Sequence, residues 1–208
     1  YYKEDGTQAT YWYKVDGNYY WFGTDGILKT YWQKVYNKYY WLGSDGAMRT
    51  GWQTIYGKKY YLGNANDGAM KTGWQTVDGK KYYLGNASDG AMKTGWQTID
   101  GKKYYLGNDG AMKTYWQSVD GKYYWFGTDG VMKTYWQKVY NKYYWLGSDG
   151  AMRTGWQKVY GKYYWLGHSN DGAMKTGWQT IYGKKYYFGG ANDGVMKTGW
   201  QKIGGNWY

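Results

Sequence analysis

Tryptophan rings are the residues of this chain best placed to act on another molecule, and they recur at a nearly fixed spacing. Intervals of 20 or 22 residues separate ten of them: Trp12, Trp32, Trp52, Trp74, Trp96, Trp116, Trp136, Trp156, Trp178 and Trp200. A period of this size marks a stack of similar small units. Because such units display the same side chains again and again, we expect the chain to bind something repetitive rather than to catalyse a reaction.

Residues that could support catalysis or hold a metal are not arranged for it. The aspartates recur in Asp-Gly pairs, which are turn signals rather than paired catalytic carboxylates. His168 is the only histidine, and we expect it to be exposed and incidental. No nucleophile lies beside a base, and no cluster of metal ligands is evident. We therefore predict no enzyme activity, no metal and no cofactor.

The position seven residues after each periodic tryptophan, here called the companion slot, divides the repeats into two kinds. In the aromatic repeats the companion slot holds Tyr19, Tyr39, Tyr123, Tyr143 or Tyr163, and the residue two further on is Trp21, Trp41, Trp125, Trp145 or Trp165. In the lysine repeats the slot holds Lys59, Lys81, Lys103 or Lys185, followed two residues later by Tyr61, Tyr83, Tyr105 or Tyr187. The two substitutions go together and lie beside the periodic tryptophan.

Each repeat is predicted to be a β-hairpin that positions these rings. Residues 95–114 read GWQTIDGKKYYLGNDGAMKT, in which two short strand-forming runs flank Asp100-Gly101. A two-residue turn of this kind is typical of a type I′ hairpin, which needs positive φ at both central residues. This register places Trp96 opposite Tyr105 and Thr98 opposite Lys103 on one face of the hairpin.

A second Asp-Gly pair follows every complete hairpin, and the repeats of 22 residues carry two extra residues just before it, as in Asn64-Ala65-Asn66. Insertions at one point imply a surface loop. A lone hairpin is marginal in water, so the hairpins must stack on one another. We predict an all-β solenoid of stacked two-stranded hairpins whose stability is nearly one-dimensional.

Composition limits what holds such a stack together and what it binds. Aromatics make up 24% of the 208 residues and cysteine is absent, so we expect tyrosine and tryptophan rather than an aliphatic core to supply the burial, and we exclude disulfides. The periodic tryptophans alone could serve simply as core. The net charge of +12 suits anionic partners, or serves solubility. We rank nucleic acid low, because no continuous basic groove can be inferred, and we find no membrane span or signal peptide.

The chain also carries a longer period. Residues 31–52 and 135–156 are identical, 104 residues apart, which indicates recent expansion or a designed sequence. We interpret residues 1–208 as one array of about ten hairpins of 20–22 residues. Both ends fall inside repeats, so we expect a piece of a longer array, and uncapped ends make pairing into a homodimer plausible.

With GWQTIDGKKYYLGNDGAMKTGW in view, the chain resembles the choline-binding, or cell-wall-binding, repeats of Gram-positive bacteria and their phages. The resemblance covers essentially the whole chain. It implies a left-handed β-solenoid with about three hairpins per turn, and an extracellular location at the bacterial surface. The implied ligand is choline or phosphocholine on teichoic acid, held in aromatic cages between consecutive hairpins, because ring faces are natural hosts for a quaternary ammonium.

Carried onto this sequence, the resemblance implies five complete cages, each made of a periodic tryptophan, its companion and a ring of the next hairpin. The sets are Trp12, Tyr19 and Trp41; Trp32, Tyr39 and Tyr61; Trp116, Tyr123 and Trp145; Trp136, Tyr143 and Trp165; and Trp156, Tyr163 and Tyr187. A methionine such as Met48 is expected in the wall.

The lysine repeats depart from this pattern. Lysine in the companion slot repels a cation, so the hairpins of Trp52, Trp74, Trp96 and Trp178 should hold choline poorly. Their sequences resemble the repeats of clostridial toxins and streptococcal glucan-binding proteins, which implies that they bind sugars by stacking. A carbohydrate-binding module and an engineered structural solenoid with vestigial cages therefore stand as alternatives.

Overall fold

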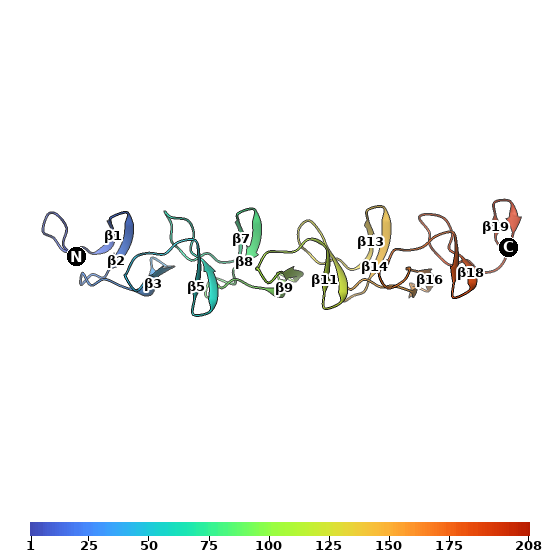
Figure 1. Cartoon of the computed structure of the whole chain (residues 1–208), viewed down its shortest axis with the longest axis horizontal. Coiled ribbons are helices and arrows are strands. Elements are labelled where there is room, and N and C mark those ends of the chain that lie inside the picture. Colours follow the sequence, from blue (N-terminus) through green and yellow to red (C-terminus); the bar gives the residue numbers. More distant parts are fainter. The chain divides into compact units, whose positions relative to one another are not determined.

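The computed structural model describes all 208 residues and contains β-hairpins, turns and loops but no helix (Figure 1). The hairpins are the two-stranded antiparallel pairs β1 (Tyr11–Val15) and β2 (Asn18–Phe22), β3 (Tyr31–Val35) and β4 (Lys38–Leu42), β5 (Trp52–Ile55) and β6 (Lys58–Tyr61), β7 (Trp74–Val77) and β8 (Lys80–Tyr83), β9 (Gly95–Ile99) and β10 (Lys102–Leu106), β11 (Tyr115–Val119) and β12 (Lys122–Phe126), β13 (Tyr135–Val139) and β14 (Lys142–Leu146), β15 (Trp156–Val159) and β16 (Lys162–Trp165), β17 (Trp178–Ile181) and β18 (Lys184–Tyr187), and β19 (Lys202–Ile203) and β20 (Asn206–Trp207). The predicted all-β fold of stacked hairpins is confirmed. No segment forms a helix that could cross a membrane.

The turns adopt the conformation that their residues predict. Asp16 and Gly17 have φ values of 47° and 84°, and Tyr36 and Asn37 have 47° and 63°. Positive φ at both central residues is the signature of the type I′ turn, whose twist matches that of the flanking strands. The predicted turn type is confirmed.

The predicted register is also present. Trp52 lies opposite Tyr61, and Thr54 lies opposite Lys59. In an aromatic repeat the same positions pair Trp32 with Trp41. Because side chains alternate along a strand, the periodic tryptophan, the companion slot and the ring paired with the tryptophan share one face of each hairpin.

Successive repeats are joined through their backbones. Tyr20, in β2, forms an antiparallel bridge with Ala47, in the loop that follows the next hairpin. Beside it, the Met48 N–H donates to the Tyr19 carbonyl over 2.8 Å. The same donation recurs from Met70 to Tyr39. Each companion residue is therefore fixed by the repeat that follows it.

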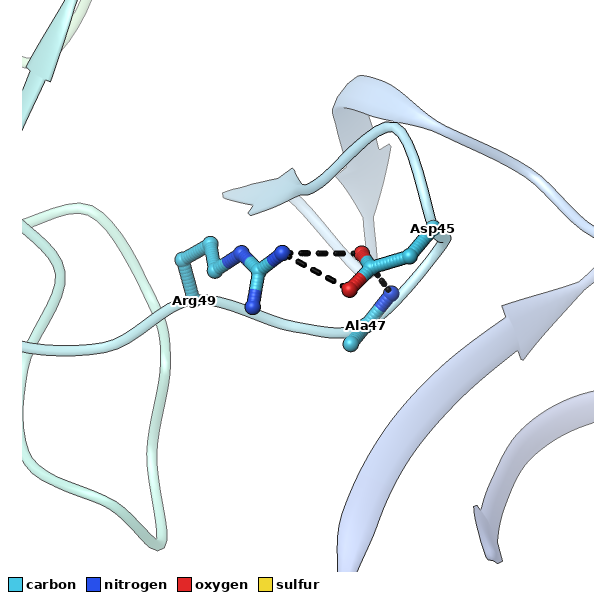
Figure 2. Close-up of polar contacts among 3 residues, drawn as sticks. All are labelled: Asp45, Ala47 and Arg49. Atoms are coloured by element: carbon cyan, nitrogen blue, oxygen red, sulfur yellow. Dashed lines mark hydrogen bonds and ion pairs between the residues drawn. The ribbon is translucent and has the colours of Figure 1, made fainter.

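The loops after the hairpins are closed by their aspartates. Asp45 Oδ1 accepts a hydrogen bond from the Ala47 N–H over 3.0 Å, and both carboxylate oxygens accept from Arg49, at 2.9 and 2.8 Å (Figure 2). The Ala47 N–H is the main cause of a lowered pKa at Asp45, with Arg49 adding to it. These aspartates are structural, as the sequence predicts for Asp-Gly turns.

Leucine, valine, isoleucine, alanine and phenylalanine make up most of the buried core, so the prediction that tyrosine and tryptophan supply the burial is wrong. Every side chain of appreciable size that is fully buried is leucine or phenylalanine: Leu42, Leu62, Leu84, Leu106, Leu146, Leu166, Phe126 and Phe188. Valine or isoleucine at the end of the first strand is also buried in the hairpins from β3–β4 to β17–β18, as are the alanines of the bridges, among them Val35 and Ala69. The periodic tryptophans are half-buried or exposed. A few buried residues per repeat are enough to form a continuous core, because each repeat packs on its neighbours.

Contacts divide the chain into two units. The first contains residues 1–97 and 106–112, and the second contains residues 98–105 and 113–208. Apart from β9 and β10, whose residues are divided between the units, each unit is a run of successive hairpins joined as described above. The interpretation of residues 1–208 as one array, the handedness and the number of hairpins per turn stay predictions.

Candidate functional site: aromatic cages between repeats

Side chains from consecutive repeats surround a cavity beside Trp12. The Trp12 ring meets the Tyr40 ring edge-on, with 4.9 Å between centroids. Tyr19 and Met48 complete the apolar lining, while Asn66 and Asp67 form a polar side, around a cavity of about 270 Å³. Met48 thus lies in the wall, as predicted. The cavity offers ring faces, a thioether and a carboxylate.

The ring of the next repeat that contacts each of these tryptophans, here called the closing tyrosine, lies one residue before the ring predicted from the sequence. The predicted rings were Trp41, Tyr61, Trp145, Trp165 and Tyr187, whereas the rings in contact with the preceding tryptophan are Tyr40, Tyr60, Tyr144, Tyr164 and Tyr186, at 4.9 to 5.2 Å. The reason is strand alternation. Trp41 is paired with Trp32 of its own hairpin, so the neighbouring Tyr40 projects from the opposite face, toward the preceding repeat.

The other aromatic repeats bring together equivalent rings. Cavities of about 210 Å³ are lined by Trp32, Tyr39, Tyr60 and Met70, and by Trp116, Tyr123, Tyr144 and Met152. Trp136 and Trp156 make the same edge-on contacts with the tyrosines of the repeats that follow them, Tyr164 and Tyr186. In these two repeats the carbonyls of Tyr143 and Tyr163 accept hydrogen bonds from the N–H groups of Met174 and Met196. The predicted tryptophans and companions therefore occupy one recurring arrangement.

The lysine repeats place their own cation where the aromatic repeats have a ring. Lys59 Nζ lies 4.8 Å from the centroid of the Trp52 ring, and Lys81 Nζ lies 4.9 Å from that of Trp74. Trp52 still meets the tyrosine of the next repeat, Tyr82, at 5.0 Å. The scaffold of the cage is kept, and an ammonium covers the tryptophan face.

The lysine repeat nearest the C-terminus is more open. Trp178 and Tyr208 lie 5.1 Å apart, and with Lys185 they line a cavity of about 400 Å³. The side chain of Trp178 is exposed. The ammonium of Lys185 therefore faces a cavity whose rings match those of the other repeats.

A second group of rings, not predicted from the sequence, lies on four of the five aromatic repeats. Trp21 contacts Tyr11 at 5.7 Å and meets Tyr36, from the turn of the next hairpin, edge-on at 6.1 Å. Tyr11 adopts φ of 61°, a left-handed conformation that costs most residues about 1 kcal/mol. A signal was present, since tyrosine replaces glycine before Trp12, Trp32, Trp116 and Trp136 only.

His168 is exposed, as predicted, but it is not without a partner. Its ring meets Trp165 at 5.3 Å, nearly perpendicular. The contact closes one side of Trp165, which is buried in this repeat. His168 therefore packs against the hairpin, and no group of three metal-ligating side chains forms around it or elsewhere in the chain.

The electrostatics of the cages favour a neutral ring beside a carboxylate. Burial, and secondly the charge of Asp67, raise the pKa of the Tyr40 phenol above its ordinary value. Burial and Asp171 raise the pKa of Tyr144 in the same way. Tyr40 and Tyr144 therefore stay protonated well above neutral pH, and the carboxylates of Asp67 and Asp171 set a negative potential near their cavities.

Comparison with known families agrees with this geometry. A family model described as choline-binding repeat matches residues 71–115, 93–134 and 175–208. A second, described as cell wall binding repeat, matches residues 10–28, 30–48, 50–70 and 134–152. Among solved structures, choline binding protein F of Streptococcus pneumoniae, determined with a peptidoglycan analogue, is 34% identical, with a TM-score of 0.71 over 100% of this chain and 86% of that one. The chain belongs to the choline-binding repeat family.

Other choline-binding structures extend the comparison. CbpJ of Streptococcus pneumoniae is 30% identical, with a TM-score of 0.75 over 99% of this chain and 86% of CbpJ. The choline-binding domain of CbpL from the same species is 29% identical, with a TM-score of 0.62, and is covered over 98% of its length. The modular autolysin LytC is similar too, but this chain spans only 48% of it. Curated protein sequences give no significant match.

Proposed function

We propose that this choline-binding repeat chain is a non-catalytic module that binds choline or phosphocholine of cell-wall teichoic acid. The observation that carries the proposal is the cage of Trp12, Tyr19, Tyr40 and Met48 around its cavity. A quaternary ammonium donates no strong hydrogen bond, and ring faces attract it by about 0.5–2 kcal/mol. Two further cavities of the same composition support several sites on one chain.

The site residues of this proposal include the closing tyrosine in place of the ring first predicted. Each cage would consist of a periodic tryptophan, its companion tyrosine, the closing tyrosine and a methionine: Trp12, Tyr19, Tyr40 and Met48; Trp32, Tyr39, Tyr60 and Met70; Trp116, Tyr123, Tyr144 and Met152; Trp136, Tyr143, Tyr164 and Met174; and Trp156, Tyr163, Tyr186 and Met196. A module of this kind would act outside the cell, at the wall of a Gram-positive bacterium.

Calorimetric titration tests the proposal. Choline and tetramethylammonium should bind with similar millimolar affinity, because both present the same cationic head. The neutral isostere 3,3-dimethylbutanol should bind at least tenfold more weakly, since it keeps the shape and loses the charge. Absence of heat with both cations at 50 mM ligand would refute the proposal.

The same titration separates this function from nucleic-acid binding. Raising the salt concentration from 50 to 500 mM should leave choline affinity nearly unchanged, whereas binding to a phosphate backbone weakens by orders of magnitude. Sugar stacking in the lysine repeats is disfavoured, because the ammonium groups of Lys59 and Lys81 already lie over the rings a sugar would need.

A further inference from the structure

The loops that follow the hairpins come in two lengths and two backbone conformations. Short loops run from glycine to Asp-Gly with one residue between, as in residues 43–46, and long loops have three residues between, as in residues 63–68. The long loops are residues 63–68, 85–90, 167–172 and 189–194. Their first glycine has φ near +60°, as in Gly63 and Gly167, while Gly43 and Gly147 of the short loops do not have positive φ. The insertion therefore sends the chain out of the strand in a different direction.

Long loops reach the cage of the repeat two positions earlier. Asn66 and Asp67 line the cavity beside Trp12, and Ser88 and Asp89 line the one beside Trp32. In the second unit, Asn170 and Asp171 line the cavity beside Trp116. Each of these three cavities is thus built from three consecutive repeats.

The glycine of the Asp-Gly pair lies close to the methionine of the preceding repeat, in long loops and also in short ones such as residues 107–110. A Cβ atom added to Gly68 would lie 2.3 Å from Met48 Sδ, and one added to Gly90 would lie 2.3 Å from Met70 Sδ. The glycine of the Asp-Gly pair is required here because any side chain would displace the methionine. Since the methionine lines the cage, the loop is pressed against the wall of the cavity.

Loop length and companion slot vary together along the chain. Every repeat with tyrosine in the slot is followed two repeats later by a long loop, as Tyr19, Tyr39, Tyr123 and Tyr143 demonstrate. Every repeat with lysine there is followed two repeats later by a short one, as Lys59, Lys81 and Lys103 demonstrate. Tyr163 and Lys185 have no such loop within the chain. The residue in the companion slot and the length of the loop two repeats later therefore vary together, although they lie more than 40 residues apart in the sequence.

The insertion also changes the environment of the aspartate. The side chains of Asp67 and Asp89 in long loops are 31% and 32% exposed, against 52% and 56% for Asp25 and Asp45 in short loops. Asp67 Oδ2 pairs with Lys71, which anchors the carboxylate beside the cavity. A carboxylate that is partly withdrawn from water attracts a neighbouring cation more strongly than a fully hydrated one.

We propose that the long loops are specificity elements that complete the cages two repeats earlier, supplying a wall and a counter-charge for the trimethylammonium group. Loop length then decides, together with the companion slot, which repeats bind. This inference rests on the proposed choline binding and assigns part of that site to residues outside the ring set.

A single-cage variant tests the inference. Replacing Tyr39, Tyr123, Tyr143 and Tyr163 with lysine, the residue of the lysine repeats, leaves the cage of Trp12 as the only complete one. Deleting Ala65 and Asn66 from that variant converts loop 63–68 into Gly-Asn-Asp-Gly, the sequence of the short loop at residues 107–110. Because the short loop already occurs in this chain, the deletion should fold, and melting without ligand should be unchanged.

We expect the deletion to weaken choline binding at least tenfold, and Asp67→Asn, which keeps the loop length, to weaken it about threefold. An affinity within twofold of the single-cage parent for both variants would overturn the inference. If the parent and the wild-type chain both fail to bind choline, the proposed function fails instead, so the two failures are distinguishable.

The converse variant gives an independent readout. Lys59→Tyr alone should create little binding beside Trp52, because the loop at residues 107–110 is short. Adding Ala-Asn between Asn108 and Asp109 should raise the calorimetric stoichiometry by one site. Equal binding with and without the insertion would contradict the role of the loop.

Discussion

The neighbouring repeats of Trp32 and Trp52 differ in where they carry a positive charge. In the first, Lys34 lies across the hairpin from Tyr39, with its Nζ 5.7 Å from the tyrosine ring. In the second, threonine takes the place of Lys34, and Lys59 in the companion slot lies over Trp52. The lysine beside the companion slot thus lies on the first strand in one repeat, and a lysine in the slot itself lies on the second strand in the other.

That exchange teaches how one scaffold gives two kinds of repeat. A tryptophan face can bind only one cation at a time. In the lysine repeats the chain supplies that cation itself, whereas beside Trp32 the lysine, Lys34, contacts the companion ring and does not line the cavity. Five predictions follow from this contrast, in order of decreasing effect.

Moving the charge into an aromatic repeat should remove its site. For Tyr39→Lys we expect at least a tenfold loss of choline affinity beside Trp32, because a ring contact is lost and an ammonium repels the ligand, together costing about 2 kcal/mol or more. Calorimetric stoichiometry should fall by one site. Tyr39→Phe is the matched control, and an unchanged stoichiometry for the lysine variant would contradict the contrast between the repeats.

An experiment can distinguish the closing tyrosine from the ring first predicted. Tyr40→Ala should abolish choline density beside Trp12 in soaked crystals, since it removes the ring that meets Trp12. Trp41→Ala should keep that density, because Trp41 packs against Trp32 and Tyr31 instead. The reverse outcome would restore the first assignment.

Strained tyrosines should stabilise the aromatic repeats by their ring contacts alone. Tyr31 has φ of 62° where the lysine repeat has Gly51, and its ring lies 5.5 Å from Trp41. Tyr31→Ala keeps the strain and loses the contact, so it should lower the free energy of unfolding by about 1 kcal/mol. Tyr31→Gly relieves the strain as well and should be nearly neutral. Urea denaturation measures both, and equal losses would exclude strain as a factor.

Removing the internal cation should destabilise a lysine repeat slightly. Lys59→Met keeps the length of the side chain but loses the contact with Trp52, so we expect a loss of about 0.5–1 kcal/mol. Lys38→Met, at an exposed position in β4, is the control. If both variants unfold at the same urea concentration, the ammonium over the tryptophan contributes no stability.

Alkaline pH should weaken the repeats through the closing tyrosines. Their pKa values are raised from the ordinary 10.0, mainly by burial, at Tyr40, Tyr60, Tyr144 and Tyr164. A phenol with a raised pKa in the folded state contributes its full stability below pH 10 and loses it as the pH rises through the folded value. Melting temperature between pH 8 and 11 should therefore fall less in Tyr40→Phe than in the wild type. Parallel curves would show that these phenols are not involved.

Much of this structure could be predicted from the sequence because it is local. Asp16-Gly17 determines the turn, and the turn sets the register that brings Trp52 opposite Tyr61. Substitutions that go together, such as Lys59 with Tyr61, reveal residues on one face. Family membership followed from the same pattern.

Other features could not be predicted because they depend on how repeats pack. Which face of a hairpin meets the preceding repeat decides between Tyr40 and Trp41, and no property of an isolated hairpin specifies it. The aliphatic core was not predicted because each repeat contributes a single residue such as Leu42, which counts for little in the composition yet is fully buried. The contribution of Asp67 to the cavity beside Trp12 spans more than 50 residues, although the covariation of loop length was already in the sequence.

The hydrogen bond from the Met48 N–H to the Tyr19 carbonyl has a consequence for how the chain melts. In a linear array, unfolding is governed by the intrinsic stability of each repeat and by the coupling between nearest neighbours. A ligand held by three consecutive repeats would add to the coupling alone. Choline should therefore sharpen the unfolding transition as well as raise its midpoint, so that repeats which melt separately in its absence melt as one cooperative block.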